Sequence, residues 1–235
     1  MGVLDHALAV VFAIGFPLVN TPLYARRQPA LRAGDAAVRR REYLETIVWL
    51  ASMGLASIVV WLLTNRTLGM LGLGWETSWQ AITALVAALF LSALLFLQVR
   101  GVRRDPSMRA MARKTLEPVR EYLPTTRTQI RLFRGVAISA GIGEEIYYRG
   151  FLLWYFSQFM SLPWAVVMSS ALFGLAHVMH GVQATVRSTV MGFALAGLYL
   201  LSGVLWASML LHTAVDLSSG ETGVAAFGSP PQLEQ

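Results

Sequence analysis

Two adjacent glutamates and an arginine stand in the middle of the apolar stretch 134–157. Ionisable side chains within an apolar helix are costly to bury and usually face a partner or a polar cavity. Glu145 and Arg149 are four residues apart, so a helix would place them on one face as an ion pair that offsets part of this cost. Glu144 points about 100° away from Glu145 on a helix surface. Its carboxylate is therefore left free to act as a general base.

Two further apolar stretches carry histidines at helical spacing. Phe173 and His177 are four residues apart in the first, and so are His212 and Asp216 in the second. Imidazole and carboxylate groups gathered in one bundle could activate a water and stabilise an oxyanion. Structural interpretations also exist: His177 could be a core histidine bonded to a backbone carbonyl, and His212 with Asp216 could join adjacent helices. The presence of all these residues together favours catalysis.

The composition indicates that the protein is embedded in lipid. Of 235 residues, 55% are hydrophobic and 14% are charged, whereas soluble domains have roughly 25% charged residues. The mean hydropathy is +0.55. There is no cysteine, which excludes disulfides, thiolate metal sites and cysteine nucleophiles.

Apolar stretches long enough to cross a bilayer recur along the chain. A spanning helix needs roughly 20 mostly apolar residues, and the last three candidates are shorter or more polar, as expected for helices inside a bundle. The sequence thus predicts an all-α fold, a polytopic transmembrane bundle of about seven spans. The candidates are 5–24, 43–63, 79–99, 134–157, 163–180, 185–201 and 203–218.

Basic residues predict the orientation of the bundle. Of the 19 basic residues, six lie in 26–41 and ten in 100–134. Such loops face the cytoplasm, so the N-terminus is expected outside and the C-terminus inside. Topology explains the charge, and no nucleic-acid recognition pattern accompanies it. The segment 100–134 is either a helix along the membrane surface, among acidic lipid headgroups, or a solvated and partly disordered loop.

Helix geometry predicts that the ionisable residues meet. At a rise of 1.5 Å per residue, Glu144 lies roughly 15 Å from Arg134, at the cytoplasmic end of its span. His177 lies near the cytoplasmic end of the following span, and His212 lies roughly 13 Å from the outer loop before its own span. We therefore expect Glu144, His177, His212 and Asp216 to share the cytoplasmic half of one bundle.

The three motifs together resemble the CAAX-protease and bacteriocin-processing family of intramembrane glutamic endopeptidases, which includes the type II CAAX prenyl endopeptidases. The motifs are Glu-Glu-x-x-x-Arg, Phe-x-x-x-His and His-x-x-x-Asn/Asp, and Asp216 stands where eukaryotic members have Asn. The resemblance implies a conical catalytic cavity that opens toward the cytoplasm. It divides the chain into an N-terminal transmembrane region of about three spans, a catalytic core and a disordered tail. These are residues 1–129, 130–218 and 219–235.

The resemblance also implies roles for the site residues. Glu144 and His177 would activate the water, His212 would donate to the oxyanion, and Asp216 would orient the His212 ring. Glu145 and Arg149 would fix their helix, and Phe173 would pack beside the site. The expected enzyme needs no cofactor and no metal, and it cleaves a membrane-bound or lipidated peptide. The protein is expected in a cell membrane, and its arginine-rich composition favours a bacterial inner membrane. Its oligomeric state is left open.

Two alternatives remain open. Two glutamates, two histidines and an aspartate could bind a divalent metal that activates the water, although the His-Glu-x-x-His arrangement is absent. A non-catalytic membrane scaffold or immunity protein could also retain the fold. Such a protein would be expected to have lost Glu144 or a histidine, yet all are present.

Overall fold

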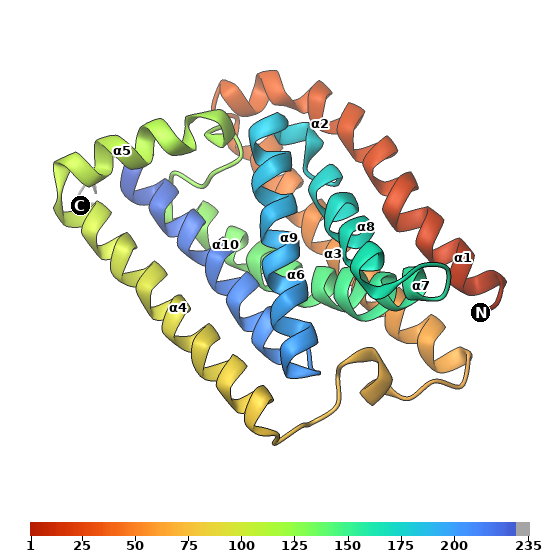
Figure 1. The fold of residues 1–235 in the computed structure, drawn as a ribbon. Helices are drawn as coiled ribbons and strands as arrows, with labels where there is room; N and C mark the ends of the chain where they lie inside the picture. The colour runs from red at the N-terminus through yellow and green to blue at the C-terminus, as the bar shows by residue number, and fades with distance from the viewer. Residues whose placement is uncertain (229–235) are drawn as a thin grey trace.

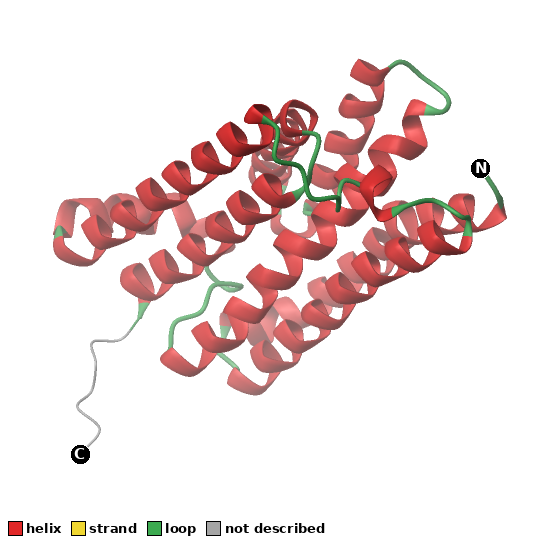
Figure 2. Cartoon of the chain, turned by 90° about the horizontal axis from the view of Figure 1, so that it is seen from below, coloured by secondary structure: helices red, strands yellow, loops and turns green. Residues whose placement is uncertain are grey.

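The computed structural model describes residues 1–228, and every regular element within them is a helix, as Figures 1 and 2 show. The predicted all-α class is therefore confirmed. Short π-helices join α1 to α2 (η1, Val11–Gly15) and α6 to α7 (η4, Glu145–Leu152). The α-helices are α1 (Val3–Val10), α2 (Phe16–Arg32), α3 (Ala36–Leu63), α4 (Trp79–Arg104), α5 (Pro106–Leu116), α6 (Arg127–Glu144), α7 (Leu153–Ser157), α8 (Leu162–Leu175), α9 (Val182–Ser202) and α10 (Trp206–Phe227).

Four of the helices are long and apolar enough to cross a membrane. They are the continuous helix Val3–Arg32, α3, α4 and α9. The other three predicted spans are also helical, but α8 has only 14 residues. The helices through Glu144 and Asp216 carry charged groups in their interiors. The multi-pass class is thus supported by length and composition, whereas the number of seven spans stays a prediction.

The first two spans are joined by a tighter turn than the predicted loop 25–42. The helix α2 continues to Arg32, and α3 begins at Ala36. The Asp35 carboxylate accepts hydrogen bonds of 2.9 and 3.0 Å from the backbone amides of Ala37 and Val38. Because this cap satisfies free amide groups of the first turn, the helix can start immediately after the turn.

The basic segment between α4 and α6 is largely helical rather than a disordered loop. The helix α5 crosses the ends of α4 and α10 (Figure 1). The Asp105 carboxylate caps it by accepting from the Ser107 amide at 2.7 Å, and Arg113 Nε donates to the Ala226 carbonyl at 2.6 Å. Of the two alternatives for this segment, the structure has the helix, and the place of that helix on the membrane surface stays a prediction.

The predicted disordered tail 219–235 is wrong in its first part, because α10 continues to Phe227. Glu221 accounts for the extension. Its carboxylate pairs with Arg134 of α6 at 2.6 Å and with Arg103 of α4. These pairs join the last turns of α10 to α4 and α6. Residues 229–235 lie outside the described residues.

Glycines let α6 approach its neighbours closely just before Glu144. A side-chain carbon at Gly143 would collide with the Leu50 carbonyl of α3, and one at Gly141 would collide with the Thr213 hydroxyl of α10. Small residues allow such backbone contacts between helices in membranes. These close contacts place Glu144 between α3 and α10.

Candidate active site

The helix that carries Glu144 changes its geometry at that residue. The α-helix α6 ends at Glu144, and the π-helix η4 begins at Glu145. A π-helical turn widens the backbone and is frequently found at functional sites. The Ser169 hydroxyl of α8 donates to the Tyr148 carbonyl within this wide turn at 2.7 Å. This contact satisfies a polar group of the irregular backbone inside the bundle.

Glu145 is fully buried and accepts two hydrogen bonds on one oxygen. Arg149 Nη1 donates to Glu145 Oε1 at 2.8 Å, and His212 Nδ1 lies 2.8 Å from the same atom. The predicted Glu145–Arg149 pair is therefore confirmed. The Arg149 guanidinium also donates to the Gly192 carbonyl at 3.3 Å and lies 4.3 Å from the centre of the Phe173 ring. This buried cation thus contacts a carboxylate, a backbone carbonyl and an aromatic ring.

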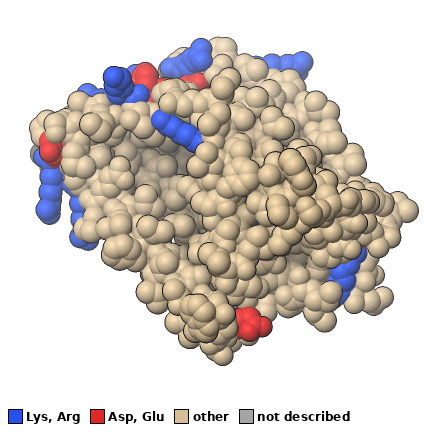
Figure 3. All heavy atoms as spheres, in the orientation of Figure 1, with Lys and Arg blue, Asp and Glu red and all other residues tan. Residues whose placement is uncertain are grey.

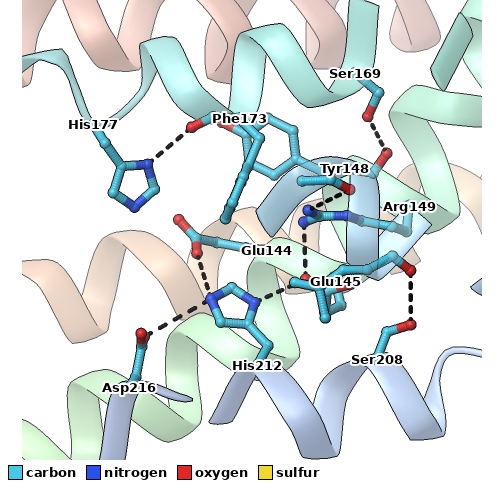
Figure 4. A network of polar contacts seen from close by, with 12 residues as sticks. Glu144, Glu145, Tyr148, Arg149, Ser169, Phe173, His177, Ser208, His212 and Asp216 are labelled. Atoms are coloured by element: carbon cyan, nitrogen blue, oxygen red, sulfur yellow. Dashed lines mark hydrogen bonds and ion pairs between the residues drawn. The ribbon is translucent and has the colours of Figure 1, made fainter. Parts of the chain in front are cut away.

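The His212 ring lies between carboxylates from two helices (Figure 4). Its Nδ1 faces Glu145, and its Nε2 lies 3.5 Å from Glu144 Oε2 and 3.8 Å from Asp216 Oδ2. We expected Asp216 to orient this ring, and that expectation needs correction. A separation of 3.8 Å exceeds a hydrogen bond, so Glu145 holds the ring. The Asp216 carboxylate instead lies near Nε2 of His212, on the same side of the ring as Glu144.

His177 presents one ring nitrogen to Glu144. Its Nδ1 lies 2.9 Å from the Phe173 carbonyl. Because a carbonyl can only accept, Nδ1 carries a proton, and in the neutral ring Nε2 keeps its lone pair. The His177 ring points toward Glu144 in Figure 4. The Phe173 ring packs edge-on against both His177 and His212, with centroids 5.1 and 5.7 Å away.

A cavity of about 310 Å³ brings Glu144, His177 and Asp216 onto one wall. Glu145 and His212 are buried behind Glu144 and do not line it. The cavity extends to Arg27, Glu42 and Glu45 and to Arg187 of α9. Arg27 bonds both glutamates there at 2.7 Å. This is the end of the molecule where the basic side chains gather over α5 and the end of α2, as Figure 3 shows.

Residues 126–218 match the family model described as type II CAAX prenyl endopeptidase Rce1-like. This segment is similar to the Rce1-like family. The match confirms the resemblance inferred from the three motifs, and it nearly coincides with the predicted core 130–218. It indicates a multi-pass membrane endopeptidase of the CAAX-protease type. No curated protein and no solved structure matches the chain.

The wall opposite the Rce1-like segment comes from the N-terminal half, which the sequence left without a role. Phe16 and Leu23 of α2 and Trp49 of α3 line the cavity, and the Phe16 and Trp49 rings lie 5.4 Å apart. Pro118 and Tyr122 close it from the segment after α5. No motif marks these residues, because packing residues of a cavity wall have no required type.

The described part of the chain has no set of side chains arranged to bind a metal ion. Within residues 1–228, no group of three His, Asp or Glu side chains is arranged to hold a metal ion. The carboxylates of Glu144, Glu145 and Asp216 instead surround the His212 imidazole, and Glu145 also pairs with Arg149.

Proposed function

We propose that the protein is an intramembrane endopeptidase in which Glu144 and His177 activate a water without a metal. The observation that carries this proposal is that Glu144 and His177 line one cavity, with His177 Nδ1 bonded to the Phe173 carbonyl, while Glu145 is bonded to Arg149 and His212. Glu144 makes one polar contact among the described residues, the 3.5 Å approach to His212. Its carboxylate is therefore available to accept a proton.

The reaction follows from these positions. A water held between the Glu144 carboxylate and His177 Nε2 gives its proton to Glu144, and its oxygen attacks the scissile carbonyl carbon. The carbonyl oxygen then carries the negative charge of a tetrahedral intermediate. When the carbon–nitrogen bond breaks, Glu144 returns the proton to the leaving amine. The two products are a carboxylic acid and an amine, which exchange a proton to become a carboxylate and an ammonium ion, so atoms and charge balance.

His212 would donate to the developing oxyanion once the scissile carbonyl lies beside Glu144, because its Nε2 lies behind that carboxylate, 3.5 Å from Glu144 Oε2. With Nδ1–H bonded to Glu145, a second proton on Nε2 makes the ring a cation. Carboxylates of Glu144, Glu145 and Asp216 all lie within 3.8 Å of that ring and would stabilise its charge. A fixed donor that does not reorganise during the reaction is what oxyanion stabilisation requires.

We also propose that the cavity opens to the cytoplasm in a bundle of about seven spans. The cavity reaches the end that carries the basic segments, and basic loops remain on the cytoplasmic side. A peptide joined to a lipid, or the juxtamembrane part of a membrane protein, could enter from that side. The arginine-rich composition supports a bacterial inner membrane as the location.

Cysteine labelling tests this orientation cleanly, because the chain has no cysteine of its own. A single cysteine at the exposed position of Ala110 in α5 should react with a membrane-impermeant maleimide only after cells are opened. A cysteine at Glu76, in the opposite connection, should react in intact cells. The reverse pattern would contradict the proposed orientation.

A comparison of cell peptides tests the proposed function. Membranes from cells that make the intact protein should contain new peptide termini that are missing from cells with Glu144→Ala at equal abundance. We expect the termini to belong to membrane-associated substrates. A biological effect that Glu144→Ala leaves intact, with no terminus depending on Glu144, would favour the non-catalytic scaffold instead.

A further inference from the structure

A second cavity lies on the basic end of the molecule, and it belongs to no part of the mechanism. Its volume is about 630 Å³. We call it the basic pocket. It is lined by Leu31, Arg32, Gly34, Arg39, Glu117, Pro118, Arg120, Glu121, Thr125, Thr126 and Phe227.

Arg39 is the unusual residue of the basic pocket, because it is a buried cation without an anion. Its side chain is 5% exposed. Among residues 1–228, all its hydrogen-bond acceptors are neutral: the Leu31 and Glu121 carbonyls at 3.2 and 3.1 Å, and the side chains of Thr125 and Gln129 at 3.4 and 3.2 Å. Its Nε is buried without any acceptor in that range of the chain. The hydrogen bonds orient the guanidinium but leave its charge uncompensated.

A buried charge normally requires a counter-charge. The carbonyl of Leu31 lies in the last turn of α2, where the helix dipole supplies only about half of an elementary charge. Glu121 offers its backbone carbonyl to Arg39, while its carboxylate accepts from Gln28 at 2.8 Å. The pocket therefore lacks one negative charge beside Arg39.

Two exposed arginines on the rim of the pocket are free to move toward such a charge. Arg32 and Arg120 are 64% and 57% exposed. Each has one loose carboxylate contact, to Glu121 at 3.7 Å and to Glu117 at 3.4 Å. With Arg39, the lining holds three arginines against two glutamates. Arginine forks match the oxygens of a phosphate group, which can accept several such bonds at once.

We propose that the basic pocket binds a phosphate-bearing anion, and that its source is the headgroup of an acidic membrane lipid. The lipid source follows from the position of the pocket at the end of the bundle where the basic side chains gather (Figure 3). The proposal stands on the contacts of Arg39 and is independent of the peptidase mechanism. It also has a consequence for the proposed active site, because Pro118 lines both cavities. A headgroup bound to Arg120 would fix the segment that closes the candidate active site.

Lipid binding to the full chain in mild detergent tests the proposal. The probes are short-chain phosphatidylglycerol, short-chain phosphatidylcholine and inorganic phosphate, each at matched ionic strength. Binding is measured by native mass spectrometry and by the shift of the thermal unfolding midpoint. Arg32→Gln/Arg120→Gln removes the two rim cations and leaves the buried contacts of Arg39 intact, so this variant should fold. Arg40→Gln is the matched control, since Arg40 is exposed on the same helix as Arg39 but lies outside the pocket.

We expect phosphatidylglycerol to bind the double variant at least about tenfold more weakly than the wild type, because charge-assisted hydrogen bonds are lost. Arg40→Gln should bind like the wild type, and phosphatidylcholine should bind weakly to all three proteins. If the binding of inorganic phosphate also weakens when Arg32 and Arg120 are replaced, the free anion is a ligand as well. If inorganic phosphate does not bind, the lipid headgroup alone is the ligand. Equal binding of phosphatidylglycerol to all three proteins would overturn the proposal. An equal loss in Arg40→Gln would do the same, because it would indicate a diffuse basic surface.

Discussion

Glu144→Gln should lower the rate of peptide cleavage by a factor of at least about 10², the size of a lost general base. Glutamine keeps the shape of the side chain but cannot accept the proton of the water. Glu144 makes no short hydrogen bond among the described residues, its nearest polar contact being His212 at 3.5 Å. The thermal unfolding midpoint should therefore stay near that of the wild type. Rates on an identified substrate and unfolding in the same detergent measure both effects.

Glu45→Gln is the matched control for this experiment, because Glu45 lines the same cavity but pairs with Arg27 and Arg41 instead of a histidine. It should keep cleavage within a few-fold of the wild type. Chelators should leave the wild-type rate unchanged, and added zinc should not restore Glu144→Gln. Activity that disappears with a chelator and returns with zinc would instead support the metal-dependent alternative. Full activity of Glu144→Gln would contradict the role of Glu144.

Spacing along one helix was sufficient to predict some contacts of the site. Glu145 and Arg149 are four residues apart, and the expected ion pair forms even though the helix becomes π-helical there. The π-helix itself has no sequence signal here, since its backbone is supported by Ser169 from another helix. The same limit applies to the Glu145–His212 bond, which joins residues 67 positions apart. The sequence could place both residues in one bundle, but not choose between Glu145 and Asp216 as the partner of the ring.

Pairing between distant charged residues also explains the errors at the ends of the elements. The sequence predicts residues 219–235 to be a disordered tail, but Glu221 of this segment pairs with Arg103 and Arg134 of two other helices. At the opposite end, Asp5 is fully buried and bonded to Arg66, whose guanidinium packs on two tryptophan rings. In the sequence alone, a charged residue indicates a helix end or a loop, because its ion-pair partner in another helix cannot be identified. Long-range partners follow from the packing of the helices, which hydropathy alone does not determine.

Glu145→Gln should damage folding as well as activity, unlike Glu144→Gln. The Glu145 carboxylate is the only one within ion-pair distance of Arg149 among residues 1–228, and it also holds His212. Glutamine removes this negative charge and leaves the Arg149 cation in the bundle without an anion. Its amide group would also occupy the place of Glu145 Oε2, which is buried and has no hydrogen-bond partner in residues 1–228. Breaking a buried ion pair from one side costs roughly 3–5 kcal/mol.

The expected results are a clearly lower unfolding midpoint, a reduced yield of folded protein and weak cleavage by the protein that remains. Glu45→Gln again serves as the control, now for stability. It breaks ion pairs in which Glu45 is 38% exposed, and such pairs contribute less than about 1 kcal/mol. Glu145→Asp keeps the charge at a shorter reach and should recover part of the stability. If Glu145→Gln unfolds at the same temperature as Glu144→Gln, the buried Glu145–Arg149–His212 network does not stabilise the bundle, and Glu145 would need a different role.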